Sequence, residues 1–371
     1  MGSSSNWLNV DSLLKQVPDD LGEDDYIEPL TILCQSFNEL DCSTWLGRTF
    51  IRKQIILLLK NRAKLYQFVS QRENQPVKKP LFVLGLPRSG TTYLYNLLYQ
   101  DPSNRSPKTW EIAYPFPEHK DNRLRKWKKI SSMSLKISLL KSITGDFNHI
   151  HSAGANLPEE DTIINLLSLR TILFLFIGNV KQYADYLRKC DNTPVMLWHS
   201  RFLQYLQSQQ HTERWLLKAP GHVQLIQSLS DYYPEACFIN IRRNPVTSFA
   251  SLCSFADFLQ SNMFNKIDHK ELGRMMLSFW SSSLDKIHEY RNGPNAGRLI
   301  DIQYDDFVKS PIENVKAIYS YFNLSYSTEL ENNMRKYIAY NTKQRKKIKK
   351  HQYSLAKYGL TEDEVRERIV V

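Results

Sequence analysis

The chain has 371 residues, of which 42% are hydrophobic and 12% aromatic, enough to bury the core of one large domain with an accessory segment. Its formal net charge of +11 favours an anionic ligand without choosing between a nucleotide, a nucleic acid and an acidic surface. The 5 cysteines are an odd number and include no C-x-x-C pair, which argues against a disulfide framework or a zinc site.

Residues 1–78 predict helices and no strand, including a long amphipathic helix over 51–69. We expect them to form a helical cap over the substrate side of a domain in 79–371. A docked arm that serves only stability or dimerisation, in a possible homodimer, is the alternative. The first residues lack the basic start and apolar stretch of a secretory signal, so we expect a cytoplasmic protein.

The central pattern is 81–98, LFVLGLPRSGTTYLYNLL. Leu81–Leu84 is typical of a buried parallel strand, Gly85–Gly90 is a loop of small residues, and the apolar positions after Thr92 have helical spacing. In such a unit the loop N–H groups form an anion nest, and the helix N-terminus adds roughly half a positive charge. The sequence therefore predicts a phosphate site here.

This loop differs from the Walker A loop of nucleotide kinases, G-x-x-x-x-G-K-[ST]. Gly85 and Gly90 keep the spacing, but Thr91 stands at the lysine position and the cation, Arg88, lies inside the loop. No strand reads as a clear source of a magnesium-binding aspartate, since FINIRR at 238–243 ends in arginines. The site suits an anion handled without a metal. A P-loop kinase that lost its lysine is the alternative.

Two basic runs, RLRKWKK at 123–129 and KQRKKIKK at 343–350, have no evident role beside a nucleotide site. Such runs can bind nucleic acid or a sulfated glycan, so a non-enzymatic polyanion-binding module is a second alternative. A solvated helix face is the more ordinary explanation, and we expect no nucleic-acid partner. The most apolar run, 162–180, is interrupted by Asn165 and Arg170, so we expect a buried helix and no membrane role.

Three further strands are predicted at 215–217, 237–241 and 298–304, each followed by a helical segment. Strands that alternate with helices predict a P-loop-like α/β fold, a parallel sheet with helices on both faces. Ligands bind such sheets at the carboxyl ends of the strands. There, Arg243 follows a strand, and Ser251 lies about two helical turns further on. A guanidinium and a hydroxyl on one face can hold a terminal phosphate.

Four segments, in this order, resemble the sulfotransferases that use 3′-phosphoadenosine 5′-phosphosulfate (PAPS), in particular a mostly bacterial branch of that family. They are PRSGTT at 87–92, LLKAPGH at 216–222, the spacing of Arg243 and Ser251, and IQYDDF at 302–307. The resemblance implies PAPS as co-substrate and adenosine 3′,5′-bisphosphate (PAP) as product. It assigns cofactor binding to Arg88, Ser89, Gly90, Thr91, Thr92, Arg243, Ser251 and Tyr304, with the tyrosine near adenine.

The resemblance also implies an in-line transfer of the sulfuryl group to a hydroxyl or nitrogen, without a metal. Two cations would assist it: Arg88 at the leaving phosphate, and Lys218 at the bridging oxygen or a sulfuryl oxygen. We expect a small-molecule or carbohydrate-like acceptor. Its pocket is expected from the loops at 105–119, 145–160 and 255–270, because acceptor pockets in this superfamily are built from variable loops.

The acceptor would need a general base within hydrogen-bond reach. Glu111 resembles the glutamate base of tyrosylprotein sulfotransferases and is the first candidate. His222 is the second, although cytosolic sulfotransferases carry their histidine where this chain has Pro220. Glu159 and Glu160 are third, and a place near a helix N-terminus would equally explain them.

Overall fold

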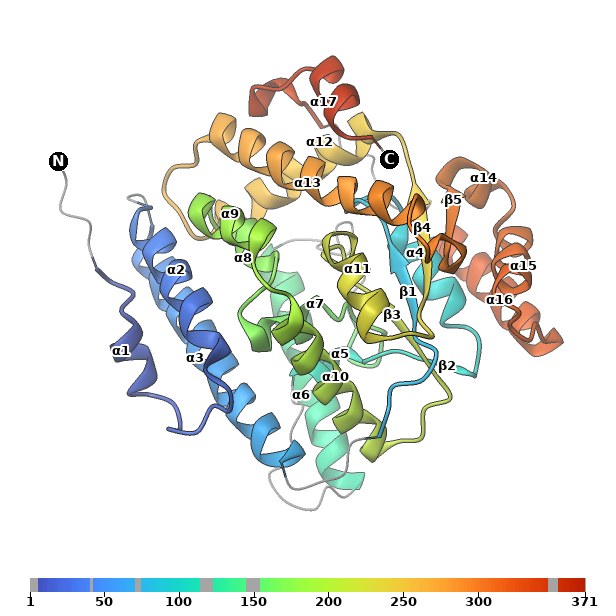
Figure 1. The fold of residues 1–371 in the computed structure, drawn as a ribbon, viewed down its shortest axis with the longest axis horizontal. Coiled ribbons are helices and arrows are strands. Elements are labelled where there is room, and N and C mark those ends of the chain that lie inside the picture. Colours follow the sequence, from blue (N-terminus) through green and yellow to red (C-terminus); the bar gives the residue numbers. More distant parts are fainter. Residues whose placement is uncertain are drawn as a thin grey trace.

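The computed structural model describes residues 6–40, 43–70, 75–113, 123–144, 154–345 and 353–370. In these residues one sheet contains five parallel strands in the order β2-β3-β1-β4-β5 (Figure 1). Their bounds are β1 Leu81–Leu84, β2 Asn104–Arg105, β3 Arg214–Lys218, β4 Cys237–Arg242 and β5 Leu299–Gln303. The predicted P-loop-like α/β fold is confirmed. Parts of the predicted acceptor loops and of the second basic run lie outside the described residues.

Strand β1 lies at the centre of the sheet, and all its residues are buried. Its side chains alternate between two apolar cores, as the period of two in a strand requires. Phe82 and Leu84 face the larger core, whereas Leu81 and Val83 face the smaller one. Because helices cover both faces, the strand reads as a continuous apolar run and not as an alternating one.

The register brings the predicted site segments to one edge of the sheet. Val83 lies opposite Lys218 of β3, and Leu84 lies opposite Asn240 of β4. The loop after β1, the end of β3 and the end of β4 therefore emerge side by side. This edge is where an open parallel sheet binds its ligands.

Helices cover the two faces and extend to both sides of the sheet, with α1–α3 and α14–α16 at opposite ends of the molecule (Figure 1). The bounds are α1 Val10–Leu14, α2 Ile27–Asn38, α3 Trp45–Val69, α4 Thr91–Leu98, α5 Thr109–Ala113, α6 Arg123–Thr144, α7 Thr162–Asn165, α8 Leu173–Ile177, α9 Lys181–Lys189, α10 Thr193–Gln209, α11 His222–Tyr232, α12 Pro245–Gln260, α13 His269–Arg291, α14 Tyr304–Lys309, α15 Pro311–Tyr321, α16 Thr328–Arg345 and α17 Glu362–Arg368. None of the described helices combines the length and apolar character needed to cross a membrane.

The N-terminal helices belong to the larger core. The fully buried Arg62 of α3 joins three segments, because Nε donates to Leu21 O at 2.8 Å and Nη1 donates to Leu167 O at 2.9 Å. The same guanidinium pairs with Asp25. A buried guanidinium with this many acceptors fixes the N-terminal segment against the main body. Whether the segment caps the substrate side stays a prediction.

The predicted helix over 162–180 was wrong in its continuity. Helix α7 ends at Asn165, Leu169 takes a left-handed backbone conformation with φ +55°, and α8 starts only at Leu173. Hydrogen bonds explain the break: Tyr183 OH donates to Leu169 O at 2.6 Å, so this carbonyl does not continue a helix. Arg170 Nη1 donates to Asp25 O at 2.9 Å, which holds the next residue toward the N-terminal segment.

One strand was missed by the sequence prediction, and the bounds of β3, β4 and β5 each differ from it by one residue. The edge strand β2 was not predicted, because its 2 residues follow a turn and give no periodic signal. The last strand ends one residue earlier than expected, at Gln303, so that Tyr304 is the first residue of α14.

Candidate active site

The loop after β1 needs glycine at both ends. Gly85 has φ +141° and Gly90 has φ +103°, which favour glycine because it has no Cβ. A Cβ on Gly85 would lie 2.7 Å from Ile241 O, and one on Gly90 would lie 2.4 Å from Cε2 of Tyr304. Between them, Arg88 also has a positive φ of 71°, an unusual conformation for a residue with a side chain. The sequence pattern thus reflects a tightly folded loop.

This loop presents groups that fit an anion. Ser89 is buried, and its Oγ has no hydrogen-bond partner among the described residues. That Oγ lies inside the loop, 2.8 Å from where a Cβ on Gly85 would stand. Helix α4 begins at Thr91 directly after the loop, with its N-terminus toward the same space. An orphaned hydroxyl beside a helix N-terminus suits a phosphate or sulfate group.

The second predicted anion motif meets this loop. Strand β4 ends at Arg242, and Asn244 caps α12 by accepting from Thr247 N at 3.3 Å, which sets the helix that carries Ser251. Arg88 Nε donates to Ser251 Oγ at 3.2 Å across a sequence separation of 163 residues.

Arg243 completes the contact, because its Nη1 donates to Arg88 O at 3.0 Å. Two arginines and a serine from motifs far apart in the sequence therefore converge at one place.

Tyr304 closes the other side of this cluster. Its ring packs on Gly90, and the Cζ of Arg243 lies 4.3 Å from the ring centroid. This stacking holds the arginine in place beside the loop. Figure 1 shows the short β5–α14 connection beside β4, consistent with the pairing of these strands.

Lys218 is the last residue of β3, and its side chain lies beside the start of α4. Its Nζ donates to Thr92 Oγ1 at 3.2 Å and to Glu160 Oε1 at 2.5 Å. The lysine side chain is only 2% exposed, whereas that of Glu160 is 23% exposed. The structure thus places one cation and one accessible carboxylate at the start of α4.

Comparison with known proteins decides the family. The model of the sulfotransferase family matches residues 80–328, which include all the cofactor-binding residues predicted from the sequence. The chain belongs to the sulfotransferase family.

Two solved sulfotransferases share the fold over nearly the whole chain. The sulfotransferase STF1 from Mycobacterium tuberculosis H37Rv is 28% identical, with a TM-score of 0.85, and the match covers 98% of this chain and 99% of that one. STF9 from Mycobacterium avium is 24% identical, with a TM-score of 0.87, covering 99% and 96%.

A curated relative, omega-hydroxy-beta-dihydromenaquinone-9 sulfotransferase Stf3 from Mycobacterium bovis, is 23% identical over 266 residues. The match covers 66% of this chain and 63% of the relative's length.

In this sulfotransferase fold, Glu111 is buried and held by two donors. Arg105 Nη2 donates to Glu111 Oε1 at 3.4 Å, and Lys108 N donates to Oε2 at 2.9 Å. Arg105 in turn donates to Leu206 O at 2.9 Å and to Gln210 O at 2.7 Å. The carboxylate therefore ties α5 to the end of α10. Neither of these two hydrogen bonds joins Glu111 to the loop after β1 or to Lys218.

His222 is also fully buried, in a cluster that sequence reasoning missed. Its Nε2 lies 3.0 Å from Asp161 Oδ2, and His199 Nε2 lies 2.9 Å from the same oxygen. His199 Nδ1 and Tyr233 OH are 2.8 Å apart, and Asp161 N donates to Lys218 O at 3.3 Å. This cluster thus lies directly behind the Lys218–Glu160 pair.

The charges of this cluster are coupled. Burial alone raises the pKa of the Asp161 carboxyl, but the imidazoles of His222 and His199 outweigh it and hold that pKa well below its usual range. Burial lowers the pKa of His199, and its hydrogen bond to Asp161 offsets only part of this. The three ligand atoms lie within 4.8 Å of one another, close enough to surround a metal ion, but hydrogen bonding accounts for the contacts of His199 and Asp161.

One signal could have pointed to this cluster. Asp161 follows the base candidate Glu160 in the PEED segment. A third acidic residue in a row indicates that one of the three is paired with a basic side chain elsewhere in the chain. His199 gives no such signal, because a lone histidine in an apolar helix is usually a satisfied core residue.

Proposed function

We propose that this protein transfers the sulfuryl group of PAPS to a hydroxyl of a small-molecule acceptor. The convergence of Arg88, Ser251 and Arg243 carries the proposal. Two guanidinium groups held at one place by hydrogen bonds of 3.2 and 3.0 Å suit a ligand with several negative charges. A nucleotide with phosphates at both its 5′ and 3′ positions can occupy the loop and the Arg243 motif together.

In this proposal each end of the nucleotide has its own donors. Arg88, the orphaned hydroxyl of Ser89 and the start of α4 would hold the 5′-phosphosulfate. Arg243 and Ser251 would hold the 3′-phosphate, while Tyr304 supports Arg243 and borders the adenine site. Thr91 and Thr92 add hydroxyls at the helix start.

The proposed transfer needs charge stabilisation and one base. The acceptor oxygen forms a bond to sulfur as the bond from sulfur to the bridging 5′-phosphate oxygen breaks, and PAP leaves with that electron pair. Arg88 and Lys218 stabilise the negative charge that develops on the phosphate and sulfuryl oxygens. The acceptor proton passes to a carboxylate.

We propose Glu160 as this carboxylate. It contacts Lys218, which contacts Thr92 at the start of α4, and it is the more accessible partner of the pair. Glu111 is engaged by Arg105, and His222 is fully buried beside Asp161. These contacts favour positioning roles for Glu111 and His222, the two candidates that the sequence ranked first.

The proposed class of acceptor is supported by the name of a relative and not by the geometry of the site. The name of Stf3 specifies a hydroxylated menaquinone derivative, which supports a small-molecule alcohol here as well. A carbohydrate-like acceptor, a homodimer and a cytoplasmic location stay predictions.

A transfer assay tests the proposal. Purified protein is incubated with sulfur-labelled PAPS and a panel of lipid, phenolic and sugar alcohols, with a chelator in place of magnesium. We expect label transfer to at least one acceptor class, and its loss in Arg88→Ala but not in Arg335→Ala, an exposed arginine of α16. Magnesium-dependent phosphate transfer from ATP, with no use of PAPS, would instead establish a P-loop kinase.

A further inference from the structure

The basic run that the nucleotide site leaves unexplained forms helix α6. The sequence of this helix contains lysine and arginine but no aspartate or glutamate. Its cations are Arg123, Arg125, Lys126, Lys128, Lys129, Lys136 and Lys141. A helix of one charge sign attracts an anionic partner over a Debye length.

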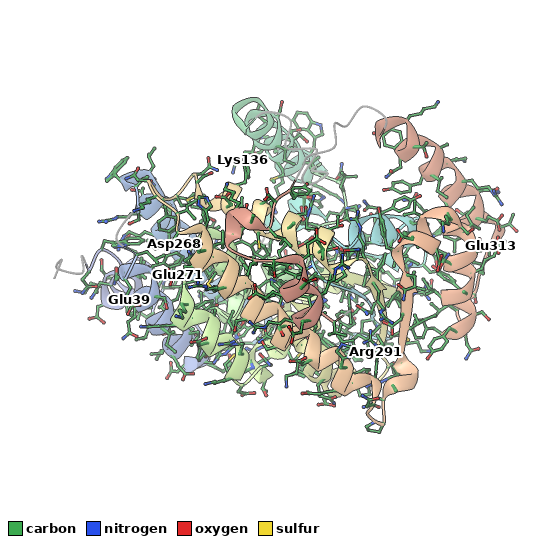
Figure 2. The ribbon with its side chains drawn as sticks, turned by 90° about the horizontal axis from the view of Figure 1, so that it is seen from above. Glu39, Lys136, Asp268, Glu271, Arg291 and Glu313 are labelled. Carbon is green, nitrogen blue, oxygen red and sulfur yellow. The ribbon has the colours of Figure 1, made fainter. Side chains whose placement is uncertain are left out.

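Large apolar side chains on α6 point away from the protein. Leu124 is 58% exposed, Trp127 is 63% exposed and Leu135 is 62% exposed. Trp127 lies about one helical turn after Leu124, and Leu135 lies about three turns after it, which places the three side chains on one face of the helix. Figure 2 shows α6, labelled at Lys136, standing at the margin of the molecule. The helix thus combines a positive charge with an outward apolar face.

The inner side of α6 packs against α5. Ile137 is buried, and Lys126 Nζ lies 5.5 Å from the centroid of the Trp110 ring on α5. In sequence, α6 lies between two of the loops expected to line the acceptor pocket, 105–119 and 145–160. A surface bound by α6 would therefore lie close to the route by which an acceptor enters.

We propose that α6 docks the protein onto an anionic lipid bilayer, with Leu124, Trp127 and Leu135 inserted at the boundary between headgroups and acyl chains. Interfacial helices have this composition: low overall hydrophobicity, lysine and arginine on the polar side, and tryptophan and leucine on the other. A nucleic acid would be attracted by the charge alone and would leave the apolar face in water. The proposal departs from the expectation of no membrane role, and it does not depend on the proposed sulfuryl transfer.

Vesicle co-sedimentation tests it on the full-length protein. The probes are vesicles of phosphatidylcholine alone and of an equal mixture with phosphatidylglycerol. We expect binding to the anionic vesicles that weakens as salt is added. The double variant Leu124→Ser/Trp127→Ser is expected to bind at least about tenfold more weakly, because two inserted apolar side chains are lost. The control Val308→Ser, which removes an exposed valine of α14, is expected to bind like wild type.

The contributions of positive charge and of apolar insertion to vesicle binding can be measured with separate variants. Lys128→Gln is expected to weaken binding about fivefold, since a basic residue near an anionic surface contributes about 1 kcal/mol. Equal binding to both vesicle types would overturn the proposal, as would full binding by the Leu124→Ser/Trp127→Ser variant. So would binding to RNA that matches vesicle binding and survives this variant. Self-association of the wild type that the same variant abolishes would assign the apolar face to a second copy of the chain and refute the bilayer assignment.

Discussion

Replacing Asp161 by asparagine is expected to destabilise the fold by about 3 kcal/mol. The carboxylate faces two buried imidazoles, His199 at 2.9 Å and His222 at 3.0 Å. Both imidazoles lie against the same oxygen, Oδ2. Asparagine keeps the volume and can place its amide oxygen there, but its amide nitrogen then takes the buried position of Oδ1, which has no hydrogen-bond partner among the described residues. An orphaned buried donor costs about 1–3 kcal/mol, and the loss of a charged acceptor adds about 1 kcal/mol. The sum agrees with the lower range for breaking a buried ion pair.

Equilibrium unfolding in urea measures this effect. For a chain of this size, with a slope of about 3 kcal/mol per molar urea, the midpoint is expected to fall by about 1 M. Asp285→Asn, a change of the same kind at an exposed position of α13, serves as the control. A midpoint for Asp161→Asn within the scatter of that control would refute the view that the cluster is an essential buried network.

Three further outcomes are expected. Glu160→Gln lowers kcat by about 10²–10⁴-fold with little change in PAP affinity, whereas Glu111→Gln mainly lowers the free energy of unfolding. The reverse pattern in rate and unfolding assays would assign the general base to Glu111. The free energy of unfolding falls as the pH drops below about 6.5, since the lowered pKa of buried His199 means that the unfolded chain takes up the proton first. His199→Gln should flatten this dependence in urea titrations, and an unchanged slope would contradict it. Arg62→Ala costs about 3–5 kcal/mol because it leaves Asp25 and three backbone carbonyls without their donor. A loss under about 1 kcal/mol would show that the N-terminal segment is held by other contacts.

The convergence of the groups assigned to the proposed nucleotide site could be predicted because their chemistry is encoded in short local patterns. The glycines at 85 and 90 mark a backbone that no other residue adopts easily, and Arg88 stands between them. Arg243 lies between β4 and α12 and Ser251 lies within α12, so the sequence indicates that both follow the same strand end. Strand order at the sheet edge then brings both patterns together, as the parallel α/β rule predicts.

The proposal of Glu160 as the base and the break in 162–180 could not be reached in the same way, because both depend on contacts between distant segments. The sequence ranks Glu111 ahead of Glu160, and the contacts with Arg105 and Lys218 are what reverse this order in the proposal. The break at Leu169 arises from Tyr183. Its hydroxyl donates a hydrogen bond to the Leu169 carbonyl, which therefore accepts no helical hydrogen bond.

The most direct test of the account measures by calorimetry how tightly two nucleotides bind to the wild type and to Arg243→Ala. PAP and adenosine 5′-phosphate differ only in the 3′-phosphate, the group assigned to Arg243 and Ser251. We predict that wild type binds PAP at least about tenfold more tightly, as expected for a charged arginine–phosphate contact. In Arg243→Ala this preference should nearly disappear. If wild type bound both nucleotides equally, or if Arg243→Ala kept the full preference, the two motifs would not hold one doubly phosphorylated adenosine, and the proposed cofactor site would be wrong.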